Sequence, residues 1–261
     1  MSERPRVYRT RGFVLKRMDL GEADKILTIY TSSSGKLRAV AKGVRRPSSR
    51  LGGHVDDFAY ADMLLARGRD LDVVTQSQTL DSFRRLREEL WRSSYGYYVS
   101  ELVDAFNEER VENRPLFELL VSTFGLLASE TDLATVVRFF ELHLLELVGY
   151  RPELGSCVRC RAEIRPEANY FSPFLGGVVC PTCGPTEASA SRISVNALKL
   201  LRHFQRLDSM PASGIKVDAA TRREVEATMR SYIEHLLERA VKSTAFLDRL
   251  RTEDASQAPA G

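Results

Sequence analysis

Four cysteines constrain this chain more than any other feature of its sequence. They form two Cys-x2-Cys pairs separated by nineteen residues, Cys157 with Cys160 and Cys180 with Cys183. Two such pairs, each in a tight turn, supply four thiolates to one tetrahedral ion, which suits Zn²⁺ and leaves no position for a substrate. The spacing therefore predicts a structural zinc site, with four free thiols as the weaker alternative. A redox role would need a βαβ setting that the surrounding sequence lacks.

A basic stretch, residues 35–50, is the second constraint. It reads GKLRAVAKGVRRPSSR and contains no acidic residue. Its first half alternates cations with apolar residues, which a β-strand would place on opposite faces, and its second half is typical of a loop. The pattern fits a polyanion-binding surface, or a strand edge that charge protects from aggregation. The candidate cations are Lys36, Arg38, Lys42, Arg45, Arg46 and Arg50.

The charge of the chain is unevenly distributed. Residues 1–80 carry 15 of the 38 Lys and Arg but 9 of the 35 Asp and Glu, a net charge of +6, whereas the remainder has a net charge of −3. This asymmetry favours an anion-binding N-terminal part on a neutral or acidic scaffold. No apolar run is long enough for a membrane helix, and no signal peptide is evident, so we expect a cytoplasmic protein.

The hydrophobic pattern predicts an α+β protein of several domains. Five short β runs with turn residues between them indicate a five-stranded barrel of the OB-fold type over residues 1–80. We expect an α-helical bundle over 81–149 and 191–251, a zinc-binding insertion over 150–190 and a disordered tail over 252–261. The β runs are Gly12–Met18, Lys25–Thr31, Lys36–Lys42, Asp57–Ala66 and Leu71–Gln78. The expected helices are Leu80–Phe106, Pro115–Ser129, one from Thr131 or Asp132 to Val148, Val195–Leu207 capped by Ser194, and one from Asp218 to about Leu250.

Catalytic motifs are not found in the sequence. It contains no HExxH, GxSxG or GxGxxG pattern, and no nucleophile, base and oxyanion partner come together in it, so we expect no enzyme. Four aromatic residues of the predicted barrel have two interpretations, because they would either stack on bases or fill the core. These are Phe13, Tyr30, Phe58 and Tyr60.

The chain resembles the bacterial RecO family of DNA repair and recombination mediators. The resemblance covers most of the chain and is strongest over residues 11–53, RGFVLKRMDLGEADKILTIYTSSSGKLRAVAKGVRRPSSRLGG, followed by a helical region that a four-cysteine site interrupts. It implies an OB-fold, a helical domain and a zinc module. Each Cys-x2-Cys pair and the turn after it form a zinc knuckle. One departure from the family is Arg161, because the first knuckle often has glycine at this position, and this puts the exact geometry of the turn in doubt.

The same resemblance implies a function. RecO proteins bind single- and double-stranded DNA, anneal complementary strands and, with RecR, help to load recombinase onto DNA coated by the single-stranded-DNA-binding protein. Carried over, the six cations become DNA contacts and the four cysteines become zinc ligands. The competing hypothesis is a zinc-stabilised scaffold for protein interactions, whose DNA binding would be weak or indirect.

Overall fold

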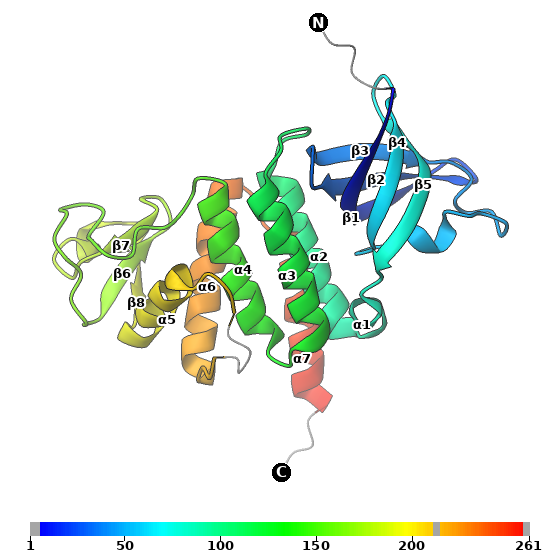
Figure 1. The fold of residues 1–261 in the computed structure, drawn as a ribbon. Helices are drawn as coiled ribbons and strands as arrows, with labels where there is room; N and C mark the ends of the chain where they lie inside the picture. The colour runs from blue at the N-terminus through cyan, green and yellow to red at the C-terminus, as the bar shows by residue number, and fades with distance from the viewer. Residues whose placement is uncertain (1–5, 211–214, 258–261) are drawn as a thin grey trace, which may run out of the picture. The chain divides into compact units, whose positions relative to one another are not determined.

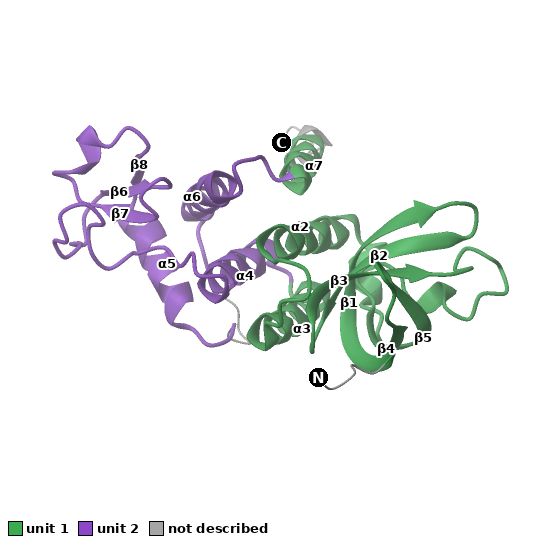
Figure 2. Ribbon diagram, turned by 90° about the horizontal axis from the view of Figure 1, so that it is seen from above, with its two compact units in different colours: residues 1–130, 242–261 green, residues 131–241 purple. Residues whose placement is uncertain are grey.

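The computed structural model describes residues 6–210 and 215–257. Its elements follow one another as Figure 1 shows, and the chain divides into two compact units. Figure 2 shows one unit, residues 1–130 and 242–261, in green and the other, residues 131–241, in purple. The expected boundary after residue 80 therefore does not separate two compact units, because the barrel shares a unit with the helices that follow it.

The first unit begins with a closed five-stranded barrel. Its strands are β1 (Val7–Leu20), β2 (Asp24–Thr31), β3 (Gly35–Ala41), β4 (Tyr60–Ala66) and β5 (Asp72–Asp81). They lie in the order β1-β2-β3-β5-β4, with β4 pairing back to β1, and β3 and β5 are the parallel pair. This confirms the predicted OB-type barrel. A short 3-10 helix, η1 (Gly52–His54), lies in the connection between β3 and β4.

The alternation in β3 is realised as predicted. Leu37, Ala39 and Ala41 are fully buried in the barrel interior, whereas Arg38 is exposed between them. Small side chains at 39 and 41 leave room for larger residues of the neighbouring strands, and the alternation fixes which face of β3 points inward. The interior residues that meet them include Val14, Leu27, Ile29, Met63 and Leu65.

Aromatic side chains join the barrel to the helices of its unit. Phe13 of β1 stacks on Tyr60 of β4, with ring centroids 4.7 Å apart, and lies 5.2 Å from the ring of Phe124 in α3 (Arg114–Ser129). Phe58 packs against α2 (Leu90–Phe106) at Gly96, where a Cβ atom would come within 3.0 Å of its ring.

This packing decides between the two interpretations of the barrel aromatics. Phe13, Tyr30 and Phe58 are buried, so they belong to the core and have no surface on which a base could stack. Tyr60 alone of the four is partly exposed.

The segment after α2 is fastened to the start of β3. Lys36 Nζ donates to the carbonyl of Asp104 at 2.5 Å, and the Arg110 amide donates to the carbonyl of Lys36 at 2.7 Å. Gly35 has φ +62°, and a Cβ atom there would lie 1.8 Å from the carbonyl oxygen of Val111. Glycine is therefore required at this turn for two reasons, its left-handed backbone and the close approach of the segment after α2.

Two expected helices are interrupted. The predicted helix Leu80–Phe106 consists of α1 (Arg84–Glu88) and α2, because Glu89 has an extended backbone. The predicted helix after Asp218 ends at Leu237, where Glu238 adopts a left-handed conformation, and a new helix, α7 (Lys242–Gln257), begins in the other unit. The tail expected to be disordered from residue 252 continues α7 as far as Gln257, and residues 258–261 lie outside the described residues.

The second unit contains three helices and a small sheet. The helices are α4 (Leu133–Leu147), α5 (Val195–Arg206) and α6 (Ala219–Leu237), capped by the side chains of Asp132, Ser194 and Asp218. The cap at Ser194 was expected from the sequence and is confirmed, and of the two residues expected to begin α4, Thr131 and Asp132, it is Asp132 that caps it. Helix α4 is buried over most of its length.

The small sheet has the order β7-β6-β8. Its strands are β6 (Asn169–Ser172), β7 (Gly177–Val179) and β8 (Ser191–Ile193), with a 3-10 helix η2 (Gly184–Thr186) between β7 and β8. Because β8 pairs with β6, the cysteine-containing module extends to residue 193 rather than 190. Among the described helices, none combines the length and the apolar character that crossing a membrane requires.

A buried carboxylate provides a test of the first unit. Asp72, 1% exposed at the start of β5, accepts hydrogen bonds from the hydroxyl of Tyr8 on β1 and from Arg110 at 3.0 Å. Burial raises the pKa of Asp72, but the hydrogen bonds from Tyr8 and Arg110 outweigh burial and hold its pKa below the ordinary value. Burial, followed by the bond to Asp72, raises the pKa of Tyr8 to about 12.

Because the pKa of Asp72 is lower in the folded protein than in the unfolded chain, its carboxylate stabilises the fold at pH values above the unfolded pKa of about 4. This stabilisation is lost as the pH falls through the folded pKa. Asp72→Asn is therefore expected to lower the free energy of unfolding at neutral pH by about 1–3 kcal/mol, with a smaller loss in acid. Urea unfolding at neutral and acidic pH measures this. Asp70→Asn, an exposed neighbour, is the control, and an equal loss from both variants would contradict the role of Asp72.

Candidate nucleic-acid interface and metal centre

The six candidate cations divide into two groups by their partners. Lys36, whose side chain is only 13% exposed, is held by Asp104; Arg38 pairs with Glu109 at 2.8 Å; and Arg45 pairs more loosely with Asp19 at 3.4 Å. Lys36 therefore contributes to packing within its unit, and a polyanion would have to compete with Glu109 for Arg38.

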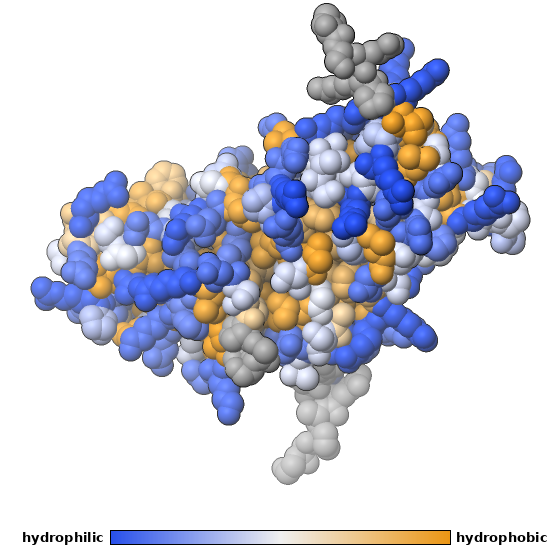
Figure 3. All heavy atoms as spheres, in the orientation of Figure 1, coloured by the Kyte–Doolittle hydropathy of each residue, from blue (hydrophilic) through white to orange (hydrophobic). Residues whose placement is uncertain are grey.

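The other three cations, Lys42, Arg46 and Arg50, are exposed. Within the described residues, none of their side chains forms an ion pair or a hydrogen bond. All three follow β3, so the unpaired charge of the basic stretch lies in the loop rather than on the strand. Figure 3 shows mainly hydrophilic side chains over the outer loops of the barrel.

The backbone of this loop is held in place. The Arg45 amide donates to the carbonyl of Ala23 at 2.9 Å, and the Gly43 amide donates to the carboxylate of Asp24 at 2.7 Å. Val44 is 8% exposed and packs with the barrel interior. The loop is thus anchored to the β1–β2 turn, and its cations project from a fixed backbone, which reduces the entropy lost when they bind a ligand.

The sequence alone did not reveal which cations are paired. Asp104 and Glu109 lie 68 and 71 residues after Lys36 and Arg38, respectively, and no local pattern connects them. Only the fold of the segment after α2 over β3 brings these charges together. A backbone β-bridge between Lys36 and Glu109 marks this contact.

The four cysteines converge in the second unit. Their Sγ atoms all lie within 4.8 Å of one another, and those of Cys160 and Cys180 are 3.7 Å apart. A tetrahedral ion with Zn–S bonds of about 2.3 Å separates its ligands by roughly 3.8 Å, so the cluster has the dimensions of a four-thiolate zinc site. Cys157 is buried and Cys160 is exposed, which places the cluster at the edge of the module.

The surroundings of the cluster favour the thiolate at Cys157, whereas the neighbouring thiols, Cys180 first, raise the pKa of Cys183 to about 12. Burial raises the pKa of Cys157, but the amides of Cys160, Cys180 and Arg159 outweigh it and bring the pKa to about 6. One of these contacts is the Cys180 amide, which donates to Cys157 Sγ at 3.4 Å. Metal ligation needs the deprotonated form, so the backbone prepares Cys157 for a cation.

The two knuckles share a turn geometry. The Arg161 amide donates to the carbonyl of Cys157, and the Gly184 amide donates to the carbonyl of Cys180, both at 2.8 Å. Gly184 is required because a Cβ atom there would lie 2.1 Å from the ring of Tyr170. Arg161, the position in doubt from the sequence, keeps the turn by adopting the left-handed conformation, with φ +65°.

Arg161→Gly tests this strain. Glycine removes the steric cost of the left-handed conformation but gains freedom in the unfolded chain, so we expect a net stabilisation of about 0.5 kcal/mol. Arg165→Gly, an exposed arginine of the same module without a positive φ, is expected to destabilise by a similar amount. Thermal unfolding of both variants measures this, and stabilisation by neither or by both would contradict the assignment.

Comparisons with known proteins agree with this architecture. Residues 1–83 match the family model for the N-terminal part of recombination protein O, and residues 87–245 match the model for its C-terminal part. A DNA repair protein RecO from Roseiflexus sp. is 42% identical over 257 residues, which is 98% of this chain and 90% of the relative. A DNA repair protein RecO from Dehalococcoides mccartyi is 38% identical over 247 residues, 95% of this chain and 97% of the relative. A third, from Pelotomaculum thermopropionicum, is 38% identical over 256 residues, 98% of this chain and 97% of the relative. With its OB-type barrel, its helices and its cluster of four cysteines, the chain belongs to the RecO family.

Proposed function

We propose that this protein is a non-enzymatic mediator of DNA repair and recombination. It binds single- and double-stranded DNA, anneals complementary strands and, with RecR, assists the loading of recombinase onto DNA coated by the single-stranded-DNA-binding protein. Family membership supports the role, and the exposed, unpaired cations Lys42, Arg46 and Arg50 are the observation that carries the DNA binding. The site of action on this proposal is the cytoplasm, at the nucleoid.

The mechanism is neutralisation of phosphates by an ordered loop. Each cation that contacts a phosphate releases condensed counterions, which makes binding favourable and dependent on salt. Contacts of this kind carry no base information, so the loop accepts any sequence and leaves the base edges free to pair. Annealing follows when two strands with neutralised backbones are held close together.

Arg38 and Arg45 extend this surface when DNA displaces their acidic partners. Both side chains are about half exposed and so are Glu109 and Asp19, so exchanging a carboxylate for a phosphate costs little. Lys36 is the weakest of the six candidates, because its contacts with Asp104 hold the segment after α2 against the barrel.

The loop is tested by Arg46→Ala/Arg50→Ala. Loss of two phosphate contacts is expected to weaken binding of single-stranded DNA and to flatten the log–log salt dependence by about 1.4. Fluorescence anisotropy at several salt concentrations measures both quantities. Lys199→Ala/Arg223→Ala removes two exposed cations from the other unit and is the matched control.

Equal losses from the two double variants would contradict the assignment of the loop. Weak binding by the wild-type protein that does not change with salt would instead favour the scaffold, in which the barrel and the cysteine module bind proteins and the charge serves solubility.

We further propose that Cys157, Cys160, Cys180 and Cys183 hold one structural Zn²⁺. Four thiolates complete a tetrahedral shell, so the ion supplies cross-linking of the two knuckles and no reaction site. The basic loop belongs to the other unit, and zinc therefore acts on the stability of the module rather than on the loop.

Cys160→Ser tests the zinc site, because Cys160 is exposed and its replacement leaves no cavity. Elemental analysis is expected to find about one zinc in the wild-type protein and little in the variant, whose thermal unfolding begins at a lower temperature. DNA affinity is expected to remain. A variant that kept its zinc and its melting temperature would argue against the site.

A further inference from the structure

The turn between β1 and β2, with the strand ends beside it, carries acidic residues next to the basic loop that follows β3. Asp19 is neutralised by two cations, Lys25 at 2.6 Å and Arg45 at 3.4 Å. Glu22 and Asp24 pair with no cation within the described residues. Carboxylates repel the phosphates of DNA, so these two residues oppose the proposed function unless they contribute to it in another way.

Asp24 uses its carboxylate on the backbone of the loop. It is half-buried and accepts a hydrogen bond from the Gly43 amide at 2.7 Å. Glu22, by contrast, is exposed, and its side chain forms no hydrogen bond within the part of the chain that the structure describes. Gly43 has φ +62° and no side chain, so its own conformational preference does little to fix the direction of the chain. The bond to Asp24 supplies that restraint.

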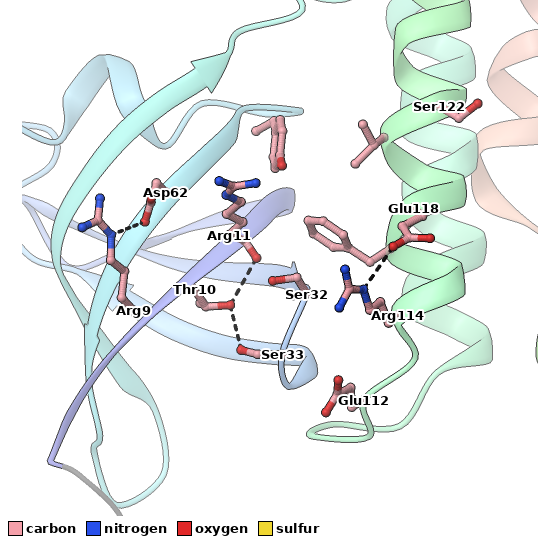
Figure 4. Close-up of a pocket in the computed structure, with 13 residues that line it drawn as sticks. Arg9, Thr10, Arg11, Ser32, Ser33, Asp62, Glu112, Arg114, Glu118 and Ser122 are labelled. Carbon is pink, nitrogen blue, oxygen red and sulfur yellow. Dashed lines mark hydrogen bonds and ion pairs between the residues drawn. The ribbon is translucent and has the colours of Figure 1, made fainter.

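Two acidic residues elsewhere in the first unit show the more usual arrangement. A cavity of about 810 Å³ lies between the barrel and α3 (Figure 4), and there Asp62 pairs with Arg9 at 2.7 Å and Glu118 pairs with Arg114 at 3.1 Å. The lining of this cavity also includes Arg11 and Glu112. An ion pair of this kind occupies the cation, whereas a carboxylate that holds a backbone amide leaves the neighbouring cations free for a ligand.

Hydrogen bonds continue from Gly43 to the free cations of the loop. The Arg46 amide donates to the carbonyl of Gly43 at 3.1 Å, and the Ser49 amide donates to the carbonyl of Arg46 at 2.9 Å. The Ser49 hydroxyl oxygen in turn accepts from the Leu51 amide at 3.2 Å. Arg46 and Arg50 therefore lie in successive turns whose first residue the carboxylate holds, and their exposed side chains extend from an ordered backbone.

We propose that Asp24 is a positioning residue for DNA: its carboxylate holds the Gly43 amide, and the turns that follow direct Arg46 and Arg50 toward phosphates. The inference rests on the proposed function and adds to it an acidic residue that raises the affinity for a polyanion. Its effect is opposite in sign to the one that charge alone predicts. Loss of a negative charge beside phosphates strengthens binding, whereas loss of order in the loop weakens it.

Asp24→Ala and Glu22→Ala separate these two effects, because each removes one carboxylate from the same turn. Asp24→Ala is expected to weaken binding of labelled oligo(dT) about fivefold, since the loop and its two arginines must then become ordered on binding. Glu22→Ala loses only repulsion and is expected to bind as tightly as the wild type, or up to about twofold more tightly. Fluorescence anisotropy at one salt concentration measures both affinities.

Asp24→Asn is the conservative variant expected to rescue binding. Its amide oxygen still accepts from the Gly43 amide, so the affinity is expected to stay within about twofold of the wild type. Hydrogen exchange of the Gly43 and Arg45 amides reports the order of the loop, and it is expected to quicken in Asp24→Ala and to remain slow in Asp24→Asn. Thermal unfolding followed by circular dichroism confirms that each variant is folded at the temperature of the titration.

Combination with Arg46→Ala/Arg50→Ala tests whether Asp24 acts through these cations. Asp24→Ala added to that double variant is then expected to lower the affinity no further. General damage to the barrel would lower the affinity by the same factor in both backgrounds, and that result would overturn the inference.

The remaining outcomes separate this inference from the proposed function. Tighter binding by Asp24→Ala would overturn the inference and show that the carboxylate competes with phosphates. Equal losses from Asp24→Asn and Asp24→Ala would also overturn it, because the hydrogen bond to Gly43 would then not be the cause. In both cases the proposed function stands, since the wild-type protein still binds DNA with steep salt dependence. Absence of salt-dependent DNA binding in the wild-type protein would overturn the proposed function and the inference together.

Discussion

The aromatic contact between the barrel and the helices after it determines which surfaces of the first unit remain available. Phe13, Phe58 and Phe124 are fully or almost fully buried where β1, α2 and α3 meet. Burying side chains of this size contributes about 2–3 kcal/mol each, and their geometry fixes the orientation of the rings. Because the helices cover this part of the barrel, these three rings are closed to ligands, whereas Tyr60 remains partly exposed in the cavity beside α3.

Charge on the barrel follows the same division. Two cations of β3 pair with acidic residues of α2 and of the segment after it, Lys36 with Asp104 and Arg38 with Glu109. In the loop beyond β3, Arg45 pairs with Asp19, whereas Lys42, Arg46 and Arg50 form no ion pair within the described residues. The hydrogen bond from Gly43 to Asp24 holds the backbone of that loop in place. The basic stretch, residues 35–50, is continuous in the sequence but divides in the structure. Some of its cations form ion pairs within the protein, and others are free to bind phosphates.

The cysteine module has a sheet of only three short strands, whose buried apolar residues include Phe171, Val178 and Ile193. The two knuckles repeat the same amide-to-carbonyl bond, with Arg161 and Gly184 as donors. Arg161 accepts an unfavourable backbone to preserve this turn, which indicates that the direction of the thiolates matters more than local strain. A metal ion of the proposed kind would add four strong bonds to this small core.

Local patterns in the sequence were sufficient for much of this structure. Alternation in β3 predicted which of its faces points inward, and the capping residues Asp132 and Ser194 predicted where two helices begin. The spacing of the cysteines predicted that the four thiols converge. Each of these patterns depends on residues that lie close together in the chain. Strong helical periodicity, by contrast, concealed the breaks at Glu89 and Glu238, where the change in backbone is confined to one residue.

What only the tertiary structure decided depends on contacts between distant residues. The barrel aromatics became core because α2 and α3 cover them, and Lys36 lost its availability because Asp104, 68 residues later, lies beside it. The cavity with Arg11 and Glu112 is formed by segments about a hundred residues apart. The sequence by itself determined the kinds of element and the chemistry that each carries. Burial and charge pairing across the fold decided which of those groups remain free to act, because both depend on neighbours that the order of residues does not reveal.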